Sequence, residues 1–273
     1  MAAVNGVELF VRRFGDRSLP PLIVIHGGPT WDHSYLLPAV AALADRAHVV
    51  LFDLRGCGRS SRTPPVGRLP VSALQPDYLA DDVAALVGWL GAGRADVLGF
   101  SYGGGVAMRV AAQHPGLVRR LIVASTTAYR ELGPPADPQE FSGDDGDDGA
   151  LSRAMAYHDA PAQIWRLDRL AEWHRVLENV RFSSDWNAPY ADGLLRPAAP
   201  DNAPEVLRAW GGPLLILHGR HDLGFPVAVA RRLHTEVPGS TLAEIPDAGH
   251  MAHFDNPPAW IAALRNFLAS VQT

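Results

Sequence analysis

Gly99-Phe100-Ser101-Tyr102-Gly103 follows the short apolar run Val97-Leu98 and precedes a segment of helical pattern at residues 106–114. A serine lifted above the end of a strand needs a turn so tight that side chains two residues before and after it would collide. Glycine at both of these positions removes the collision because it has no Cβ. The stretch therefore predicts a strand–turn–helix unit that presents the Ser101 hydroxyl at the end of a strand.

Short apolar segments lie on both sides of this turn and alternate with segments of helical pattern. Strands are expected at residues 22–26, 49–53, 97–100, 121–125, 214–218 and 242–245, and helices at 35–45, 78–90, 104–114, 227–237 and 258–271. Strands that are apolar throughout are typical of parallel sheets covered on both faces. The order predicts an α/β fold with a mostly parallel, doubly wound sheet. Ahead of it, Asn5-Gly6 between apolar residues predicts a β-hairpin.

The alternation stops after Thr126. Residues 133–149 contain three prolines, four glycines and six acidic residues, which predicts a solvated, mobile loop. Its aspartates lack the ligand spacing of a calcium-binding loop. Residues 151–179 have a helical pattern, and residues 189–204 are again loop-like. We therefore expect an insertion composed mainly of helices, after which the sheet pattern resumes.

Composition limits the classes of function. The chain has 273 residues, a formal net charge of −5 and 47% hydrophobic residues, which is ample for a large core. Without a dense block of Lys and Arg, nucleic acid is not an expected partner. Without a leader pattern or a long apolar run, no membrane association is expected and a cytoplasmic location is predicted. The single cysteine, Cys57, lies between two glycines and is expected to fill a crowded turn.

Two polar residues follow later expected strands and complete a pattern with Ser101. Asp222 comes after the strand that ends at His218, and His250 comes after the next one. A serine hydroxyl needs a base to take its proton, and the base needs a carboxylate to orient it. Because parallel strands bring their carboxyl ends to one edge, we expect Ser101, His250 and Asp222 to meet there as nucleophile, base and orienting acid.

The same chemistry needs backbone N–H groups where negative charge develops. The expected early strand ends in His26-Gly27-Gly28-Pro29, where the glycines allow close approach and proline has no N–H to offer. Gly28 and Tyr102, the residue after the serine, are the predicted donors of this oxyanion hole.

No metal or cofactor site is expected. His218 and His221 lie beside Asp222 but do not complete an open three-ligand set, so a structural role is predicted for them. The glycines at 103–105 follow the serine and do not form a dinucleotide-binding motif. His33 and His253 are expected near the site without assigned chemistry, and Asp53 and Arg55 are expected to brace the loop of the oxyanion strand.

In these features the chain resembles the α/β-hydrolases. Within that superfamily, His26-Gly27-Gly28-Pro29 and residues 53–60, Asp-Leu-Arg-Gly-Cys-Gly-Arg-Ser, resemble segments of proline iminopeptidases, which remove an N-terminal proline. The resemblance implies a helical cap at residues 127–207 inserted between two parts of the core, 1–126 and 208–273. It also implies acidic cap residues that hold the free amino group of the substrate.

The predicted cap helix supplies candidates for this contact. Glu172 and Glu178 lie beside Trp173, so a carboxylate could pair with an ammonium group while the indole packs on a pyrrolidine ring. Three departures from the iminopeptidase pattern are Thr30, Phe100-Ser101-Tyr102 in the elbow, and a short insertion.

Three functions follow from the residues. The first is release of N-terminal proline, or a similar residue, from a small peptide. The second uses the same machinery on esters, lactones or carbon–carbon bonds of small apolar substrates, with Trp165, Trp173 and Trp186 forming an apolar cap. The third is a receptor that binds a ligand without catalysis. The sequence leaves the substrate and the oligomeric state open.

Overall fold

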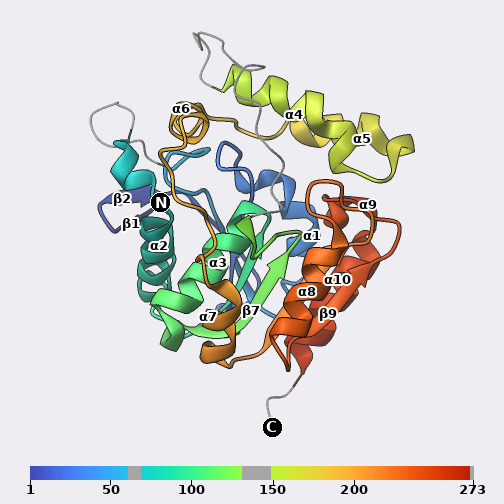
Figure 1. Ribbon diagram of the computed structural model, residues 1–273. Coiled ribbons are helices and arrows are strands. Elements are labelled where there is room, and N and C mark those ends of the chain that lie inside the picture. The colour runs from blue at the N-terminus through green and yellow to red at the C-terminus, as the bar shows by residue number, and fades with distance from the viewer. Residues whose placement is uncertain (61–68, 131–148, 271–273) are drawn as a thin grey trace.

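The computed structural model describes residues 1–60, 69–130 and 149–270 (Figure 1). Its central strands are β3 (Val11–Phe14), β4 (Pro21–Ile25), β5 (His48–Phe52), β6 (Ala95–Phe100), β7 (Val118–Ala124), β8 (Leu214–Gly219) and β9 (Thr241–Ile245). They form one sheet in the order β3-β5-β4-β6-β7-β8-β9. β3 pairs antiparallel with β5, and the remaining neighbours are parallel. The predicted α/β fold with a mostly parallel sheet is confirmed.

The predicted hairpin forms a separate two-stranded sheet. Strands β1 (Ala2–Val4) and β2 (Val7–Leu9) are antiparallel, with Val4 opposite Val7. The two residues between them have positive φ, 46° at Asn5 and 75° at Gly6. A two-residue hairpin turn whose twist matches that of its strands needs this conformation, which asparagine and glycine tolerate best.

Helices cover both faces of the sheet. α1 (Leu37–Ala41) and α10 (Pro257–Ala269) lie on one face, and α2 (Pro76–Trp89), α3 (Tyr102–Gln113), α7 (Ala203–Trp210) and α8 (Val227–Glu236) lie on the other. Each face of the sheet has its own hydrophobic core, and successive side chains of a strand alternate between the two cores. In β4, Ile23 and Ile25 pack on the α2–α3 side, and Leu22 and Val24 pack on the α1–α10 side. All four are fully buried, and each such side chain contributes about 1.5–3 kcal/mol of burial free energy.

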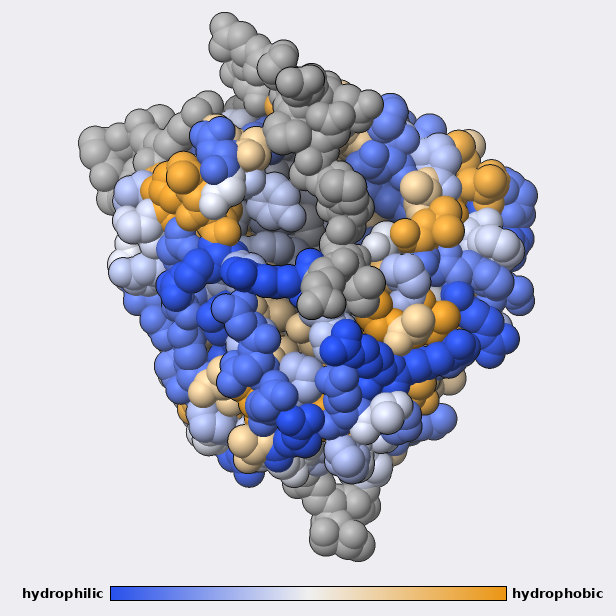
Figure 2. All heavy atoms as spheres, viewed as in Figure 1, coloured by the Kyte–Doolittle hydropathy of each residue, from blue (hydrophilic) through white to orange (hydrophobic). Residues whose placement is uncertain are grey.

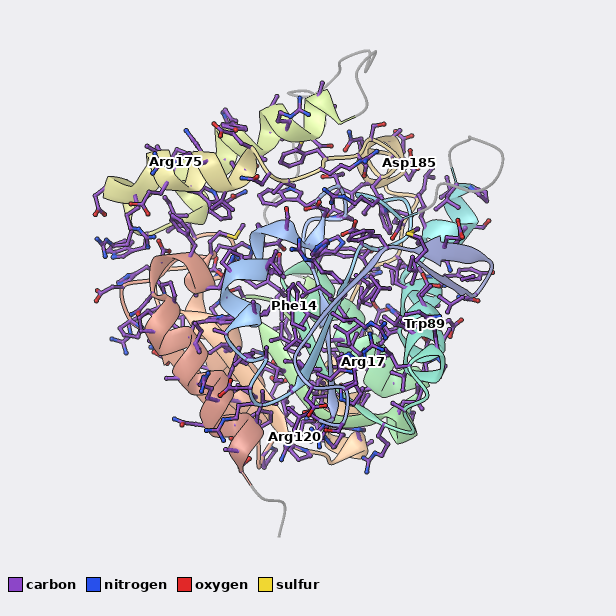
Figure 3. All side chains as sticks on the ribbon, turned by 180° about the vertical axis from the view of Figure 1, so that it is seen from behind. Phe14, Arg17, Trp89, Arg120, Arg175 and Asp185 are labelled. Atoms are coloured by element: carbon purple, nitrogen blue, oxygen red, sulfur yellow. The ribbon has the colours of Figure 1, made fainter. Side chains whose placement is uncertain are left out.

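The segment between β7 and β8 carries α4 (Ala150–Gln163), α5 (Leu170–Leu177) and α6 (Asn187–Ala191). In Figure 1, α4 and α5 lie across the top of the molecule. In the reverse view of Figure 3, Arg175 and Asp185 lie at opposite sides of this layer. The segment therefore extends across the width of the fold.

The boundaries in this segment differ from the sequence-based expectations. The helical stretch expected at 151–179 is broken at residues 164–169, shortly after Pro161, which cannot donate a helical hydrogen bond. The loop expected at 189–204 starts inside α6 and ends inside α7. Since α7 packs on α3, the expected cap boundary at 207 falls within a helix of the core layer. The acidic loop expected at 133–149 lies, except for Gly149, outside the described residues.

The helix expected at 35–45 is also shorter. A 3-10 turn at His33–Tyr35 precedes α1, and the chain then continues in tight turns, with Leu43 donating to Val40 and Arg46 to Leu43. These turns bury Leu43 completely. The expected single helix is thus replaced by a short helix and a series of tight turns.

The surface seen in Figure 2 is mainly hydrophilic, with hydrophobic patches toward its upper left and upper right. Leu167 and Leu223 are among the large apolar side chains that remain more than half exposed, at 58% and 69%. Among helices of the described residues, none combines the length and apolar character that a bilayer crossing needs.

Replacing Gly103 by alanine tests the packing of α3 against β4. A Cβ at this position would lie 2.4 Å from the Ile25 carbonyl oxygen and 2.5 Å from that of His26, and neither backbone atom can yield easily. We expect Gly103→Ala to lower the free energy of unfolding by about 3 kcal/mol, the upper end of the usual overpacking cost, as measured by urea denaturation. Gly116→Ala is the matched control because a Cβ there meets nothing within 4 Å. Equal stability of the two variants would contradict the packing argument.

Candidate active site

The turn predicted around Ser101 joins β6 to α3. Ser101 has φ 52° and ψ −120°, a conformation that costs a non-glycine residue about 1–3 kcal/mol. Its N–H donates to the Ala124 carbonyl at 2.8 Å, and its own carbonyl accepts from Gly104 at 2.8 Å. A Cβ on Gly99 would lie 2.1 Å from the Gly103 carbonyl oxygen. Both glycines of the motif are therefore required by backbone packing.

Ser101, His250 and Asp222 come together at the carboxyl edge of the sheet. The Ser101 Oγ lies 3.0 Å from Nε2 of His250, and Nδ1 of the same ring lies 2.9 Å from Oδ2 of Asp222. Asp222 follows β8 and His250 follows β9, so neighbouring parallel strands deliver both partners. The structure thus places the three side chains in one continuous hydrogen-bonded row.

The Asp222 carboxylate is buried and surrounded by donors. Its Oδ1 accepts the N–H groups of Gly224 and Phe225, each at 2.9 Å, and Nε2 of His218 lies 3.3 Å from its Oδ2. Burial by itself raises the pKa of Asp222, but attraction to His250 and the hydrogen bond from His218 outweigh it and hold that pKa well below its usual value. An ionised Asp222 can only accept a hydrogen bond, so the Nδ1–H of His250 donates to it. The other ring nitrogen, Nε2, then has a lone pair directed at Ser101.

His218 is thereby a support for the acid. Its Nε2–H donates to the Phe225 carbonyl at 2.7 Å, which closes the loop that wraps around Asp222. The sequence predicts a structural role for His218 instead of metal binding. The hydrogen bond to Phe225 is of the kind that such a role requires.

The predicted oxyanion loop follows β4. The Gly27 N–H donates to the Tyr35 hydroxyl at 2.7 Å, so in the described structure Gly28 is the glycine of this pair whose N–H remains for a ligand. Gly28 has φ +54°, and a Cβ there would lie 2.6 Å from the Trp31 ring. Tyr102 begins α3, where the first N–H groups have no carbonyl one turn earlier and the helix dipole favours negative charge.

His26 ties this loop to the chain after β5. The Leu54 N–H donates to its Nε2 at 3.0 Å, so Nδ1 carries the proton and donates to the Gly27 carbonyl at 2.9 Å. The ring is fully buried, and burial lowers its pKa. His26 is therefore a neutral ring that connects the oxyanion loop to the chain after β5.

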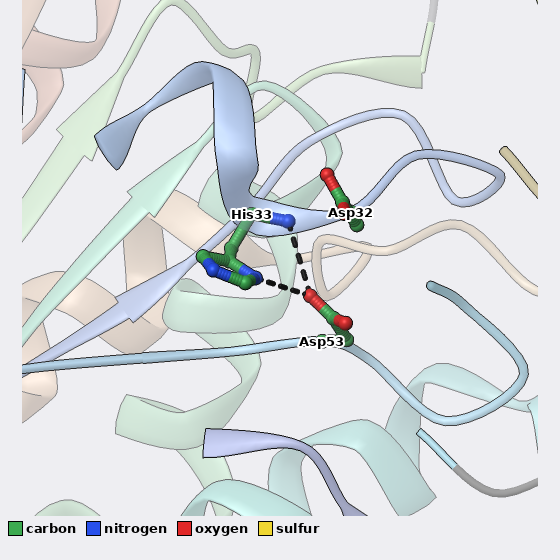
Figure 4. Close-up of side chains that lie close together, drawn as sticks. All are labelled: Asp32, His33 and Asp53. Atoms are coloured by element: carbon green, nitrogen blue, oxygen red, sulfur yellow. Dashed lines mark hydrogen bonds and ion pairs between the residues drawn. The ribbon is translucent and has the colours of Figure 1, made fainter. Parts of the chain in front are cut away.

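Asp32 and His33, which follow the oxyanion loop in the chain, form a buried cluster with Asp53 (Figure 4). Asp53 Oδ1 accepts both the N–H and the Nδ1–H of His33, and its Oδ2 accepts the Arg59 N–H. Asp32 Oδ1 accepts the Ser34 N–H, and its Oδ2 accepts from the Arg59 guanidinium at 2.8 Å. Each carboxylate oxygen thus has an N–H donor, one of them cationic, which is the pattern expected of a loop brace.

Arg55 lies in the loop after β5 and ties that loop to its neighbours. Its Nε donates to Oδ2 of Asp82 on α2 at 2.6 Å, and both side chains are buried. The Asn5 side chain donates to the other oxygen of Asp82 at 2.9 Å. The loop after β5 is thereby joined to α2 and to the amino-terminal hairpin.

Aromatic rings surround the row of three side chains. Phe100 and Phe225 lie 5.4 Å and 5.6 Å from the His250 ring, and the Trp186 ring lies 5.9 Å from that of Tyr102. Sequence reasoning named Trp186 as part of an apolar cap but missed Phe225. The sequence signal for Phe225 is that it lies three residues after Asp222. The immediate surroundings of the His250 ring therefore include two apolar rings.

His253 lies behind Phe100, with ring centroids 5.1 Å apart. The side chain is buried among Tyr35, Trp173 and Trp260, and this burial lowers its pKa to about 3. A neutral imidazole in this setting packs as an aromatic ring.

The three predicted cap residues differ in their surroundings. Trp173 is fully buried against Trp31 and Phe254, and its Nε1 donates to the Gln163 side chain at 3.3 Å. The Glu172 carboxylate is bound by Arg169 at 2.8 Å and remains about half exposed. Glu178 is exposed at the end of α5. The structure thus does not bring either glutamate into the row of Ser101, His250 and Asp222.

Comparison with known proteins places the chain in a family. The profile of the alpha/beta hydrolase fold matches residues 20–257. The chain belongs to the α/β-hydrolase family.

Its relatives act on different bonds. A crystal structure of the enol-lactonase from Burkholderia xenovorans LB400 superposes with a TM-score of 0.78 and 26% identity over 98% of this chain and 99% of that one. A putative carbamate hydrolase from Caulobacter sp. is 27% identical over 90% of this chain and 94% of its own. The proline iminopeptidase of Lactiplantibacillus plantarum is 28% identical over 97% and 98%. The chain is thus similar to several kinds of hydrolase at nearly equal distance.

Removing the Tyr35 hydroxyl tests the anchor of the oxyanion loop. In Tyr35→Phe the Gly27 N–H keeps its buried position and loses its acceptor, so we expect the free energy of unfolding to fall by about 1–3 kcal/mol, as measured by urea denaturation. Tyr157→Phe is the control, because that hydroxyl makes a longer bond, 3.3 Å, in a partly buried position. An unchanged stability of Tyr35→Phe would show that the hydroxyl is dispensable to the loop.

Proposed function

We propose that this hydrolase cleaves esters or lactones of small apolar acyl groups through a serine-bound acyl intermediate. Ser101 is the proposed nucleophile, His250 the base and Asp222 the acid that orients it. The 3.0 Å and 2.9 Å contacts that link these side chains support the assignment.

The proposed reaction begins when Ser101 Oγ attacks the carbonyl carbon while His250 Nε2 takes its proton. The negative charge on the carbonyl oxygen is stabilised by the N–H groups of Gly28 and Tyr102. His250 then returns the proton to the leaving oxygen as the ester bond breaks. Water, deprotonated by the same nitrogen, attacks the acyl carbon and restores Ser101.

The observation that carries the choice of substrate is the surroundings of Glu172 and Glu178, the two acidic cap residues predicted to bind an amino group. An aminopeptidase needs a carboxylate that faces the ammonium group of its substrate. Glu172 is instead paired with Arg169, and Glu178 is exposed. The rings of Phe100 and Phe225 beside His250 favour an apolar acyl group and a neutral leaving group. The likeness to an enol-lactonase agrees with this substrate class.

Release of N-terminal proline is the competing function, favoured by the likeness to a proline iminopeptidase over nearly the whole of both chains. It predicts that the free amino group of the substrate is essential. A receptor without catalysis is the third possibility and predicts no turnover of either substrate.

Substrate assays separate these functions. We expect hydrolysis of p-nitrophenyl butyrate with kcat/KM at least about 100-fold above that for proline p-nitroanilide, because the ester needs no amine contact and has the better leaving group. Turnover of proline p-nitroanilide that exceeds ester hydrolysis and disappears on N-acetylation would overturn the proposal in favour of the aminopeptidase. The measurement is initial-rate spectrophotometry on the purified protein.

Substitution of the proposed nucleophile and base tests the assignment directly. Ser101→Ala and His250→Ala should each reduce kcat by about 10⁴–10⁶, because the members of such a row act as a unit. A fluorophosphonate probe should label the natural protein and fail to label Ser101→Ala.

Cys57→Ala is the control for these two variants. The thiol is buried and donates to the Pro29 carbonyl at 2.8 Å, so it has no proposed part in the chemistry and kcat should stay within about twofold. Retained activity in Ser101→Ala would mean that the nucleophile is wrongly chosen.

A further inference from the structure

The loop that carries His250 is attached on both sides to the segment between α4 and α5. We call residues 163–166, the last residue of α4 and the three that follow it, the cap linker. The Gly249 N–H donates to Asp255 at 2.8 Å, and the Met251 N–H donates to the Gln163 carbonyl at 2.9 Å. The two residues that flank His250 therefore both bond to the cap linker or to the side chain that holds it.

Asp255 joins these two pieces of chain. It lies in the short helix α9 (Ala252–Asp255) and is only 4% exposed. Its Oδ2 accepts the Gly249 N–H and also the Trp165 N–H at 2.9 Å, and its Oδ1 accepts the Arg166 N–H at 3.0 Å. One buried carboxylate thus receives three backbone donors, two from the cap linker and one from the loop of His250.

Close packing shows that the two pieces form one unit. A Cβ on Gly249 would lie 3.0 Å from the Trp165 nitrogen and 3.1 Å from the Gln163 carbonyl oxygen, so a side chain there would press on the cap linker. The Trp165 ring also stacks on that of His221, the residue before Asp222, with centroids 3.8 Å apart. The cap linker consequently contacts the loops of both the proposed base and the proposed acid.

We propose that Asp255 is a positioning residue that holds His250 within reach of Ser101 by fixing its loop to the cap linker. The proposal rests on the proposed function, because it concerns the geometry of that site. A proton transfer between Ser101 and His250 depends on their separation, and a shift of about 1 Å costs on the order of 100-fold in rate. The residue acts through the Gly249 backbone, without touching the reacting atoms.

The three donors explain why a carboxylate is needed. An asparagine offers one acceptor oxygen and one NH₂ group. With its oxygen in the place of Oδ2, its NH₂ faces the Arg166 N–H; in the opposite orientation, it faces the N–H groups of both Trp165 and Gly249. Either orientation sets donor against donor, so Asp255→Asn must loosen one side of the joint while keeping its size.

The experiment compares Asp255→Asn, Asp255→Glu and Arg169→Gln in the full chain, with p-nitrophenyl butyrate as substrate. Arg169 is the matched control because its guanidinium donates to the Phe254 carbonyl at 2.7 Å and so also joins the cap segment to α9, without a bond to the loop of His250. We expect Asp255→Asn to lower kcat by about 100-fold with KM changed less than twofold. The rate of fluorophosphonate labelling should fall in parallel. Arg169→Gln should keep kcat within about twofold.

Asp255→Glu retains both acceptor oxygens at a shifted position and should recover part of the lost kcat. The proposal is overturned if folded Asp255→Asn has the kcat of the natural protein, if it changes KM alone, or if Arg169→Gln loses as much activity. Should Asp255→Asn fail to fold, as judged by circular dichroism, Asp255→Glu decides: a lower kcat at constant KM supports the proposal, and an unchanged kcat overturns it. Absence of ester hydrolysis and of labelling in the natural protein would instead reject the proposed function.

Discussion

The site depends on how closely the backbone of β4 approaches the turn at Ser101. A Cβ on Gly27 would lie 2.7 Å from the Ser101 Cβ, and one on Gly103 would lie 2.4 Å from the Ile25 carbonyl oxygen. Absence of side chains at these places lets the oxyanion loop and the start of α3 lie against each other. The proposed oxyanion donors, the N–H groups of Gly28 and Tyr102, belong to these two adjoining segments. Larger residues would push the oxyanion loop and the start of α3 apart.

Buried carboxylates support the loops around this contact, and each is supplied with N–H donors. Asp222 receives two backbone donors and His250, Asp53 receives His33 and the Arg59 backbone, and Asp255 receives three backbone donors. Buried charge is costly unless it is hydrogen-bonded. Because the donors come mainly from loop backbones, the cost is offset only when these loops have their folded conformation. The charges therefore select one arrangement of loops that have little regular structure.

The sequence predicted the sheet and the row of Ser101, His250 and Asp222 well, because apolar runs mark the strands and the polar residues that follow them must reach one edge. The catalytic roles themselves stay predictions. Contacts such as Tyr35 with Gly27, or Asp255 with Trp165, could not be predicted, since they join segments whose relative placement follows only from packing. The part of Glu172 and Glu178 in substrate binding stays a prediction. The sequence does hold a signal for their exposure: Trp173 and Leu177, four residues apart, mark the buried stripe of α5, and the glutamates lie beside it.

The residues of the proposed site are spread along the chain. Ser101 comes first, the cap linker at 163–166 follows, then Asp222, and His250 and Asp255 come last. A serine hydroxyl without a base is a weak nucleophile at neutral pH. Until residue 250 is in place, Ser101 lacks the imidazole that the fold sets 3.0 Å from its hydroxyl. The proposed nucleophile therefore meets its proposed base only after segments 149 residues apart in the chain have packed together.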